Sequence, residues 1–167
     1  MASLTPSQKT VVFSTLGAVV IGWGLFFGLR ALLPAPADAR EAGVWLALAP
    51  AVVFLVLVAA VGNARFLSEG IDPLQGKDPR FVVVTNRVLT NTTEQTFIFV
   101  LSGVALIALL PAERLGAIPA LAVLFVVARV VFWIGYLRQA VLRAPGMSLT
   151  IQINVVQLVW CALMIVR

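Results

Sequence analysis

The 167-residue sequence has no histidine, one cysteine and one tyrosine, and charged residues make up only 11% of it. The lack of histidine excludes the most common general base and the imidazole ligand of haem and zinc sites. With Cys161 as the single cysteine, no disulfide can form within the chain. The net charge of +5 does not indicate nucleic-acid binding, because the basic residues are scattered singly between apolar runs.

What the sequence has in excess is apolar residues, which make up 61% of it, with a mean hydropathy of +1.05. A soluble domain is about half apolar and about a quarter charged. Five apolar stretches have close to the roughly 20 residues that a helix needs to cross a bilayer. They cover about residues 11–33, 44–64, 88–110, 118–137 and 149–166. We predict an all-α integral membrane protein whose five transmembrane helices form a single domain over residues 1–167.

The first stretch needs separate treatment, because Ala37-Asp38-Ala39 after it resembles a signal-peptide cleavage site. The run is longer than the apolar core of a typical signal peptide, however, and only Lys9 precedes it as a basic residue. We therefore expect a retained helix over about residues 11–33, additional to a four-helix bundle over about residues 44–166.

The basic residues predict the orientation, because cytoplasmic connections carry an excess of lysine and arginine. Five crossings place seven basic residues on the side of the amino terminus: Lys9, Arg65, Lys77, Arg80, Arg87, Arg138 and Arg143. The other side has four: Arg30, Arg40, Arg114 and Arg167. We expect the amino terminus in the cytoplasm and the carboxyl terminus outside, in a bacterial inner membrane.

Polar residues inside the third and fourth stretches are the candidate site. Arg87, Asn91 and Glu94 are spaced four and three apart, which places them on one helical face. Arg129 and Tyr136 are seven apart, with Phe132 between them. At about 1.5 Å per residue, Glu94 and Arg129 reach a similar depth. Because isolated charges are costly in a membrane, we predict a pair between them.

Other polar residues have a simpler explanation. Gln152, Asn154 and Gln157 in the last stretch fit hydrogen bonding between helices. Such bonding does not explain the surplus of cations, since Arg65, Arg87, Arg129 and Arg143 have only Glu94 as an acid at their level. This surplus favours an anionic, partly polar ligand.

These residues carry a resemblance to a known family. The segment Arg87-Val-Leu-Thr-Asn-Thr-Thr-Glu94 resembles the Arg-x3-Asn-x2-Glu signature of the MAPEG family, the membrane-associated proteins of eicosanoid and glutathione metabolism. The segment Arg129–Tyr136, followed by Arg143-Ala-Pro, resembles the family's Arg-x6-Tyr pattern and the arginine beyond it. Asn63-Ala64-Arg65 is similar to the end of the family's first helix, so the resemblance covers about residues 44–167 in a bacterial-type member.

The resemblance implies a left-handed four-helix bundle, here with an extra amino-terminal helix, and a homotrimer that binds glutathione as a co-substrate between subunits. It implies that Arg87, Asn91, Glu94 and Tyr136 hold glutathione from one subunit, while Arg65 and Arg143 reach in from a neighbour. Arg143 would stabilise the thiolate as the catalytic group, with Arg129 and Phe132 as structural partners in the site. The implied activity is that of a glutathione transferase or peroxidase, with a detoxifying role, acting on lipophilic electrophiles or lipid hydroperoxides without a metal.

Several departures and alternatives stay open. Gln95 stands where several family members have a tyrosine, and Phe132 stands where well-known members have a tyrosine or a histidine. Both departures put contacts with glutathione in doubt. One alternative is a non-catalytic, lipid-binding MAPEG-like protein, and another is a small proton-coupled transporter that uses Glu94. The sequence does not distinguish transferase from peroxidase activity or name the electrophile, and it leaves open where the first helix packs.

Overall fold

The computed structural model describes residues 5–166, and five long helices account for most of them. They are α1 (Pro6–Leu32), α2 (Ala39–Phe66), α3 (Arg80–Leu109), α4 (Ala117–Arg138) and α5 (Ala144–Ile165). Short 3-10 turns connect them: η1 (Glu69–Ile71), η2 (Pro73–Gln75), η3 (Ala112–Arg114) and η4 (Ala140–Arg143). Each of the five apolar segments is long and apolar enough to cross a membrane. The predicted all-α integral membrane fold is confirmed.

Local sequence explains where the first two helices begin. The Thr5 side chain caps α1 by accepting from the backbone N–H of Gln8, whose side chain in turn accepts from Thr5. This reciprocal capping satisfies amide groups that have no partner inside the helix. Asp38 caps α2, accepting from the backbone N–H of Glu41 at 2.8 Å.

Four helices begin five or more residues before their apolar runs, namely α1, α2, α3 and α5, and two of these starts bear on the site. The third helix was predicted from about Val88 but starts at Arg80, so that Arg87 lies two turns inside α3. The last was predicted from about Leu149 but starts at Ala144, with Pro145 in its first turn. Proline suits that position, since its missing N–H would have no helical partner there. Both additional segments are helical although their hydropathy is low.

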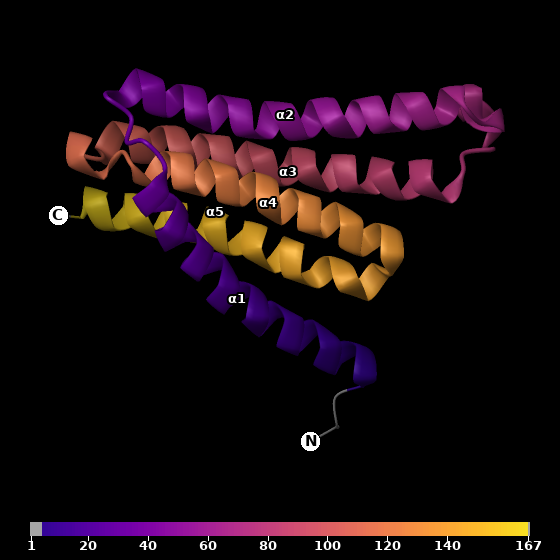
Figure 1. The fold of residues 1–167 in the computed structure, drawn as a ribbon, viewed down its shortest axis with the longest axis horizontal. Coiled ribbons are helices and arrows are strands. Elements are labelled where there is room, and N and C mark those ends of the chain that lie inside the picture. The colour runs from indigo at the N-terminus through magenta and orange to yellow at the C-terminus, as the bar shows by residue number, and fades with distance from the viewer. Residues whose placement is uncertain (1–4, 167) are drawn as a thin grey trace.

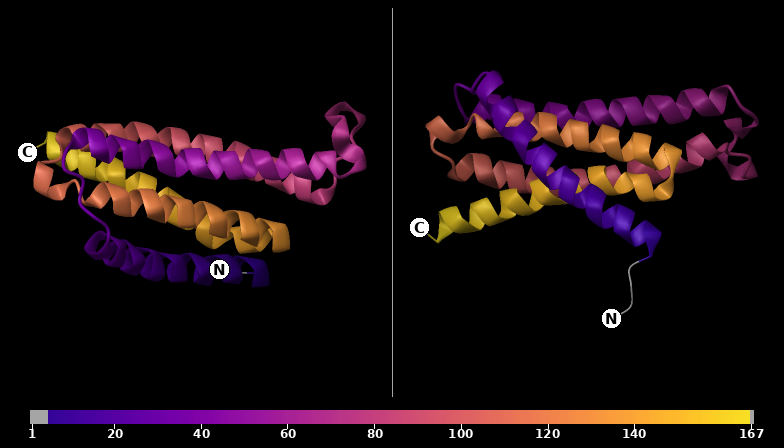
Figure 2. Two further views of the ribbon diagram at one scale, coloured as in Figure 1. Left: turned by 45° about the horizontal axis from the view of Figure 1, so that its top comes forward. Right: turned by 60° about the horizontal axis from the view of Figure 1, so that its bottom comes forward.

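Consecutive helices from α2 to α5 run antiparallel and form a bundle, and α1 lies obliquely across its outside (Figure 1). Figure 2 shows the same crossing from two other directions. Helix α4 is the centre: 61% of its most apolar 18-residue window is buried, against 11% for α1. Helix α1 packs on α5 and α4, and most of its surface is left to face lipid.

Candidate functional site

A polar pocket of about 300 Å³ opens near the ends of α3 and α4. Its lining comes from α3, α4, the turn η4 and the start of α5: Arg87, Asn91, Phe132, Tyr136, Arg143 and Met147. Five of these six were predicted as site residues from the sequence. Met147 was missed, although it lies one helical turn after Arg143 on α5, which is the spacing that could have found it.

Tyr136 is the contact point between the two exposed arginines of the pocket. Its hydroxyl lies 3.5 Å from Nη1 of Arg87, which donates to it. The guanidinium of Arg143 lies over the face of the same ring, 4.7 Å from its centroid. Phe132 packs edge-on against Tyr136 with the ring centroids 6.0 Å apart. The only ion pair among residues 5–166 involves neither arginine, so the pocket presents two guanidinium groups without a carboxylate partner.

The position of Arg143 depends on two glycines. Helix α4 ends at Arg138, and the chain reverses through η4 so that Arg143 precedes α5. A Cβ at Gly135 would collide with the carbonyl oxygen of Leu142, and one at Gly146 with the backbone of Phe132. Only residues without a side chain allow this approach of the α5 start to α4. Arg143 therefore shares the pocket of its own chain, whereas the resemblance placed it on a neighbouring subunit.

Arg129 does not pair with Glu94, and that prediction is wrong. Its side chain is 1% exposed and makes only uncharged contacts among the described residues. Nε donates to Oγ1 of Thr92 at 3.1 Å, Nη1 to Oγ1 of Thr150 at 3.3 Å, and Nη2 to Oδ1 of Asn91 at 2.9 Å. Its Cζ also lies 4.2 Å from the ring centroid of Phe132. The guanidinium thus joins α3, α4 and α5 beneath the pocket.

Helix rotation explains the error. Successive residues of an α-helix are about 100° apart, so Glu94 lies about 200° around α3 from Thr92. Thr92 is buried against α4 and α5, and Glu94 is exposed on the outside of α3. Depth along the helix is similar for both residues, but only Thr92 faces Arg129.

Asn91 connects the buried arginine to the pocket. Its Oδ1 accepts from Arg129, which leaves its amide nitrogen to donate to Oε2 of Glu94 at 3.5 Å. An amide group has one accepting and one donating end, so the bond to Arg129 fixes which end faces Glu94. Arg129 is in this way a positioning residue for the polar face of α3.

Arg65 lies apart from the pocket within this chain. Its guanidinium forms a two-pronged ion pair with Asp78 in the connection between α2 and α3, with contacts of 3.0 and 2.8 Å. This hydrogen bonding to Arg65 lowers the pKa of the Asp78 carboxyl below its ordinary value of 3.8. Arg65 is only partly buried.

The polar residues of α5 contact α3, as expected for hydrogen bonding between helices. The amide nitrogen of Asn154 donates to Oε1 of Gln95 at 3.0 Å, and Ser102 donates to Oε1 of Gln157 at 2.7 Å. Gln95 is thus held against α5 and does not line the pocket. Gln152 instead accepts from the indole nitrogen of Trp23 at 3.0 Å, which joins α5 to α1.

In the part of the chain that the structure describes, no group of three or more Cys, Asp or Glu side chains lies together. What the pocket offers is positive charge, an amide and a phenol. Such groups suit a ligand that carries carboxylates, because guanidinium groups bind carboxylates with two parallel hydrogen bonds.

Comparison with known proteins identifies the family. The profile of the MAPEG family matches residues 42–163, which span α2 to α5 and contain every residue of the polar pocket. Helix α1 lies outside this match. No curated protein and no solved structure matches the chain. With most of its length covered by the family profile, the chain belongs to the MAPEG family.

Proposed function

We propose that this protein is a membrane-bound glutathione transferase or peroxidase, in which Arg143 stabilises the glutathione thiolate for attack on lipophilic electrophiles or lipid hydroperoxides. The observation that carries the proposal is the pocket in which Arg87 and Arg143 meet at Tyr136 without a carboxylate partner. Membership of a family that includes glutathione-using enzymes supports it. A role in detoxification follows from this chemistry.

The pocket residues, together with Glu94 next to the pocket, suit the two ends of glutathione, which carries two carboxylates and one ammonium. Arg87 is placed to bind a carboxylate, and Glu94 is the acid that would take the ammonium, with Asn91 and Tyr136 as hydrogen-bonding partners. Phe132 offers a ring without a polar atom at a position where well-known family members have a tyrosine or histidine, so we propose a smaller set of polar contacts. Arg65 would serve a second molecule of the protein, since it does not line the pocket of its own chain.

Assembly as a homotrimer is part of the proposal. Glu94 is exposed near the middle of α3, a membrane-spanning helix. A charged side chain at that depth is costly against lipid and normally faces protein or a water-filled cavity. A neighbouring copy packed on this face would cover Glu94 and complete the site. The lipophilic co-substrate would come from the surrounding lipid.

Arg143 would act on the thiol through its charge. A cation beside a thiol favours the thiolate, which is the nucleophilic form. In transfer, the sulfur forms a bond to the electrophilic carbon, and the leaving group departs with the bonding electrons. With a hydroperoxide, the sulfur attacks the terminal oxygen, the O–O bond breaks and the alcohol leaves after taking a proton. A second glutathione then converts the sulfenic acid to the disulfide and water.

The orientation is also proposed. The surplus of basic residues at the pocket end favours a cytoplasmic pocket and amino terminus, with the carboxyl terminus outside, in a bacterial inner membrane. Cytoplasmic glutathione would then reach the pocket directly. Helix α1 and the bundle would act as one transmembrane domain.

The test is turnover by the purified protein with glutathione. We expect thiolate absorbance in the ultraviolet on adding glutathione, and conjugation of 1-chloro-2,4-dinitrobenzene. Arg143→Ala should remove both signals while glutathione binding, measured by calorimetry, stays largely intact. Arg138→Ala is the matched control, because Arg138 is exposed at the end of α4 and does not line the pocket.

Three results would contradict the proposal. Full turnover by Arg143→Ala would exclude the thiolate mechanism. Binding of fatty acid without any thiolate signal would favour the non-catalytic, lipid-binding alternative, which the apolar groove between α1 and α5 also suits. Proton-coupled flux without thiol dependence would favour a transporter that uses Glu94.

A further inference from the structure

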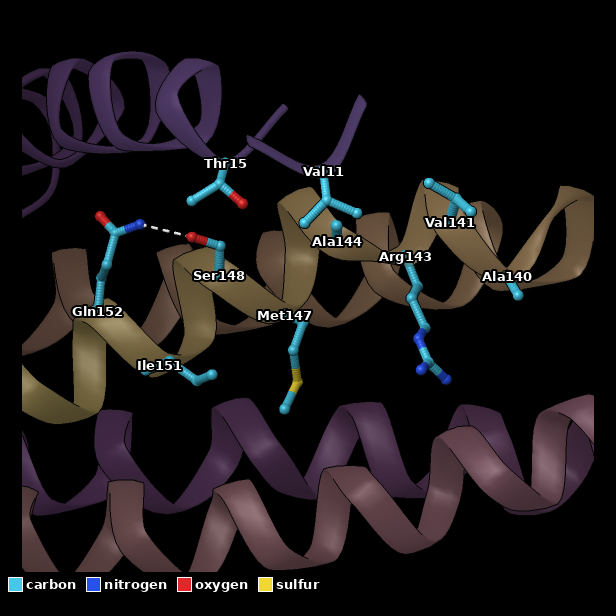
Figure 3. A pocket seen from close by; sticks show the side chains of 10 residues that line it. All are labelled: Val11, Thr15, Ala140, Val141, Arg143, Ala144, Met147, Ser148, Ile151 and Gln152. Atoms are coloured by element: carbon cyan, nitrogen blue, oxygen red, sulfur yellow. Dashed lines mark hydrogen bonds between the residues drawn. The ribbon is translucent and has the colours of Figure 1, made fainter. Parts of the chain in front are cut away.

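An apolar groove lies beside the polar pocket, on the side of α5 that faces α1. Its volume is about 600 Å³, within the roughly 300–1,000 Å³ of typical small-molecule sites. Helix α1 provides one wall and η4 with α5 the other. The lining residues are Val11, Thr15, Ala140, Val141, Arg143, Ala144, Met147, Ser148, Ile151 and Gln152 (Figure 3).

The groove lies on the amino-terminal side of a close contact between α1 and α5. At this contact, Gly22 lies so close to Leu149 that a Cβ would collide with that side chain. One residue on, Trp23 donates to Gln152, whose amide donates to Ser148 at 2.9 Å. From this point α1 runs obliquely away from α5 toward its amino terminus (Figure 1). These contacts close the inner end of the groove and use the polar atoms of Gln152.

The outer end of the groove meets the polar pocket. Arg143 and Met147 line both spaces. In Figure 3 the guanidinium of Arg143 points away from α1, while Val11 and Thr15 approach α5 from the opposite side. The groove follows α5 for roughly 14 Å between Arg143 and Gln152, at about 1.5 Å per residue. A chain lying in the groove would thus end beside the guanidinium that we assign to the thiolate.

We propose that this groove holds the alkyl chain of the lipophilic co-substrate and that Val11 and Thr15 of α1 determine which chains fit. The occupant is a linear, single-chain electrophile such as a long 2-alkenal, with its reactive end at Arg143 and Met147. This inference rests on the proposed transferase function. It assigns a role to α1, which lies outside the residues that match the family.

The reaction with such a substrate balances without a further reactant. The thiolate sulfur bonds to the β-carbon of the enal, the carbon–carbon double bond gives its electrons to the enolate, and the α-carbon takes a proton from water. Arg143 balances the charge of the thiolate. No leaving group has to depart, so the conjugate leaves with its chain intact.

The first experiment fills the groove. In Thr15→Trp or Val11→Trp we expect the KM for 2-dodecenal to rise about tenfold or more, because a misfit of even one methylene in a shaped pocket gives discrimination of that order. The KM for glutathione and the turnover of 2-butenal, which has no long chain, should not change. Comparing each variant with the unmodified protein on the same substrate cancels partitioning into detergent.

Leu16→Trp is the matched control, since Leu16 adds the same bulk next to Thr15 but is 57% exposed and lines neither space. An unchanged KM for 2-dodecenal in both groove variants would overturn the inference while leaving the transferase function standing. An equal rise in Leu16→Trp would also overturn it, because the effect would then come from α1 as a whole.

A second experiment does not need turnover. A 2-dodecenal with a photoreactive diazirine at its far end should label α1 around Thr15, together with α5 around Ser148 and Gln152, as mapped by peptide mass spectrometry. Thr15→Trp should remove this label, and Leu16→Trp should not. Label spread evenly over the lipid-facing surface would refute the groove. Labelling at Thr15 without any glutathione turnover would refute the proposed function and keep the groove as a lipid-chain site.

Discussion

The buried guanidinium of Arg129 leads to a prediction about stability. Thr92 is fully buried and provides the acceptor for Nε of Arg129 at 3.1 Å. Thr92→Val keeps the branched shape and removes that acceptor. Because the site has no access to water, Nε would remain without a partner. A buried donor without an acceptor lowers the stability of the fold, whereas removal of both partners of a hydrogen bond can be nearly neutral.

Two scales bound the expected cost. Hydrogen bonds to charged groups contribute about 1.5–3 kcal/mol in soluble proteins. Bonds between membrane helices average about 0.6 kcal/mol and reach about 1.7 kcal/mol. Arg129 keeps its bonds to Thr150 and Asn91, so the loss is one bond of three. We therefore expect Thr92→Val to lower the free energy of unfolding by about 1.5 kcal/mol, near the upper membrane value.

The assay is unfolding in mixed micelles with increasing dodecyl sulfate, followed by circular dichroism. Thr93→Val is the control on the same helix, because Thr93 is exposed and donates only to the carbonyl of Leu89 in its own helix. The decisive measurement is a double-mutant cycle in the background of Arg129→Met. If Thr92→Val costs the same with and without Arg129, the bond contributes nothing and the reasoning is refuted.

Two further predictions concern the ends of the bundle. Gly135→Ala should displace Leu142 and with it Arg143, because the new Cβ meets a backbone carbonyl. The kcat for glutathione conjugation should fall, and the free energy of unfolding should drop by about 1–3 kcal/mol. Gly62→Ala is the control, because a Cβ there meets nothing, and it should preserve kcat. The ion pair of Arg65 with Asp78 lowers the pKa of that carboxyl below 3.8, so its contribution to stability is complete above that pH and is lost as pH falls through the lower, folded-state pKa. The difference in melting temperature between the unmodified protein and Asp78→Asn should therefore be constant down to about pH 5 and shrink only below about pH 4; a difference that grows on acidification would contradict the assignment.

Much of the outline could be predicted from the sequence. Continuous apolar runs of membrane-spanning length gave five helices, because a chain in lipid must satisfy its own backbone. The helical repeat placed Arg87 and Asn91 on one face, and both line the pocket. These are local properties, set by residues within a few turns of each other.

Hydropathy was a poor guide to where α3 and α5 begin. The segment from Arg80 to Arg87 has an arginine at each end, and the segment from Ala144 to Ser148 contains proline and glycine, yet both segments are helical. Helix formation depends on backbone hydrogen bonds and not on hydropathy alone, and the first turn of a helix accepts proline because an N–H there has no helical partner. The apolar runs therefore underestimated the lengths of α3 and α5.

The sequence by itself determined that this is a helical membrane protein and which of its polar residues lie at one level of the membrane. Only the tertiary structure decided which of them meet. The rotation of α3 turns Thr92 and Asn91 toward Arg129, which donates to both, and leaves Glu94 exposed on the outer face of the helix. The glycine contacts between α4 and α5 brought Arg143 over Tyr136, and the packing of α1 on α5 formed the groove. Helix rotation and closest approach depend on side chains far apart in the sequence, so local periodicity does not contain them.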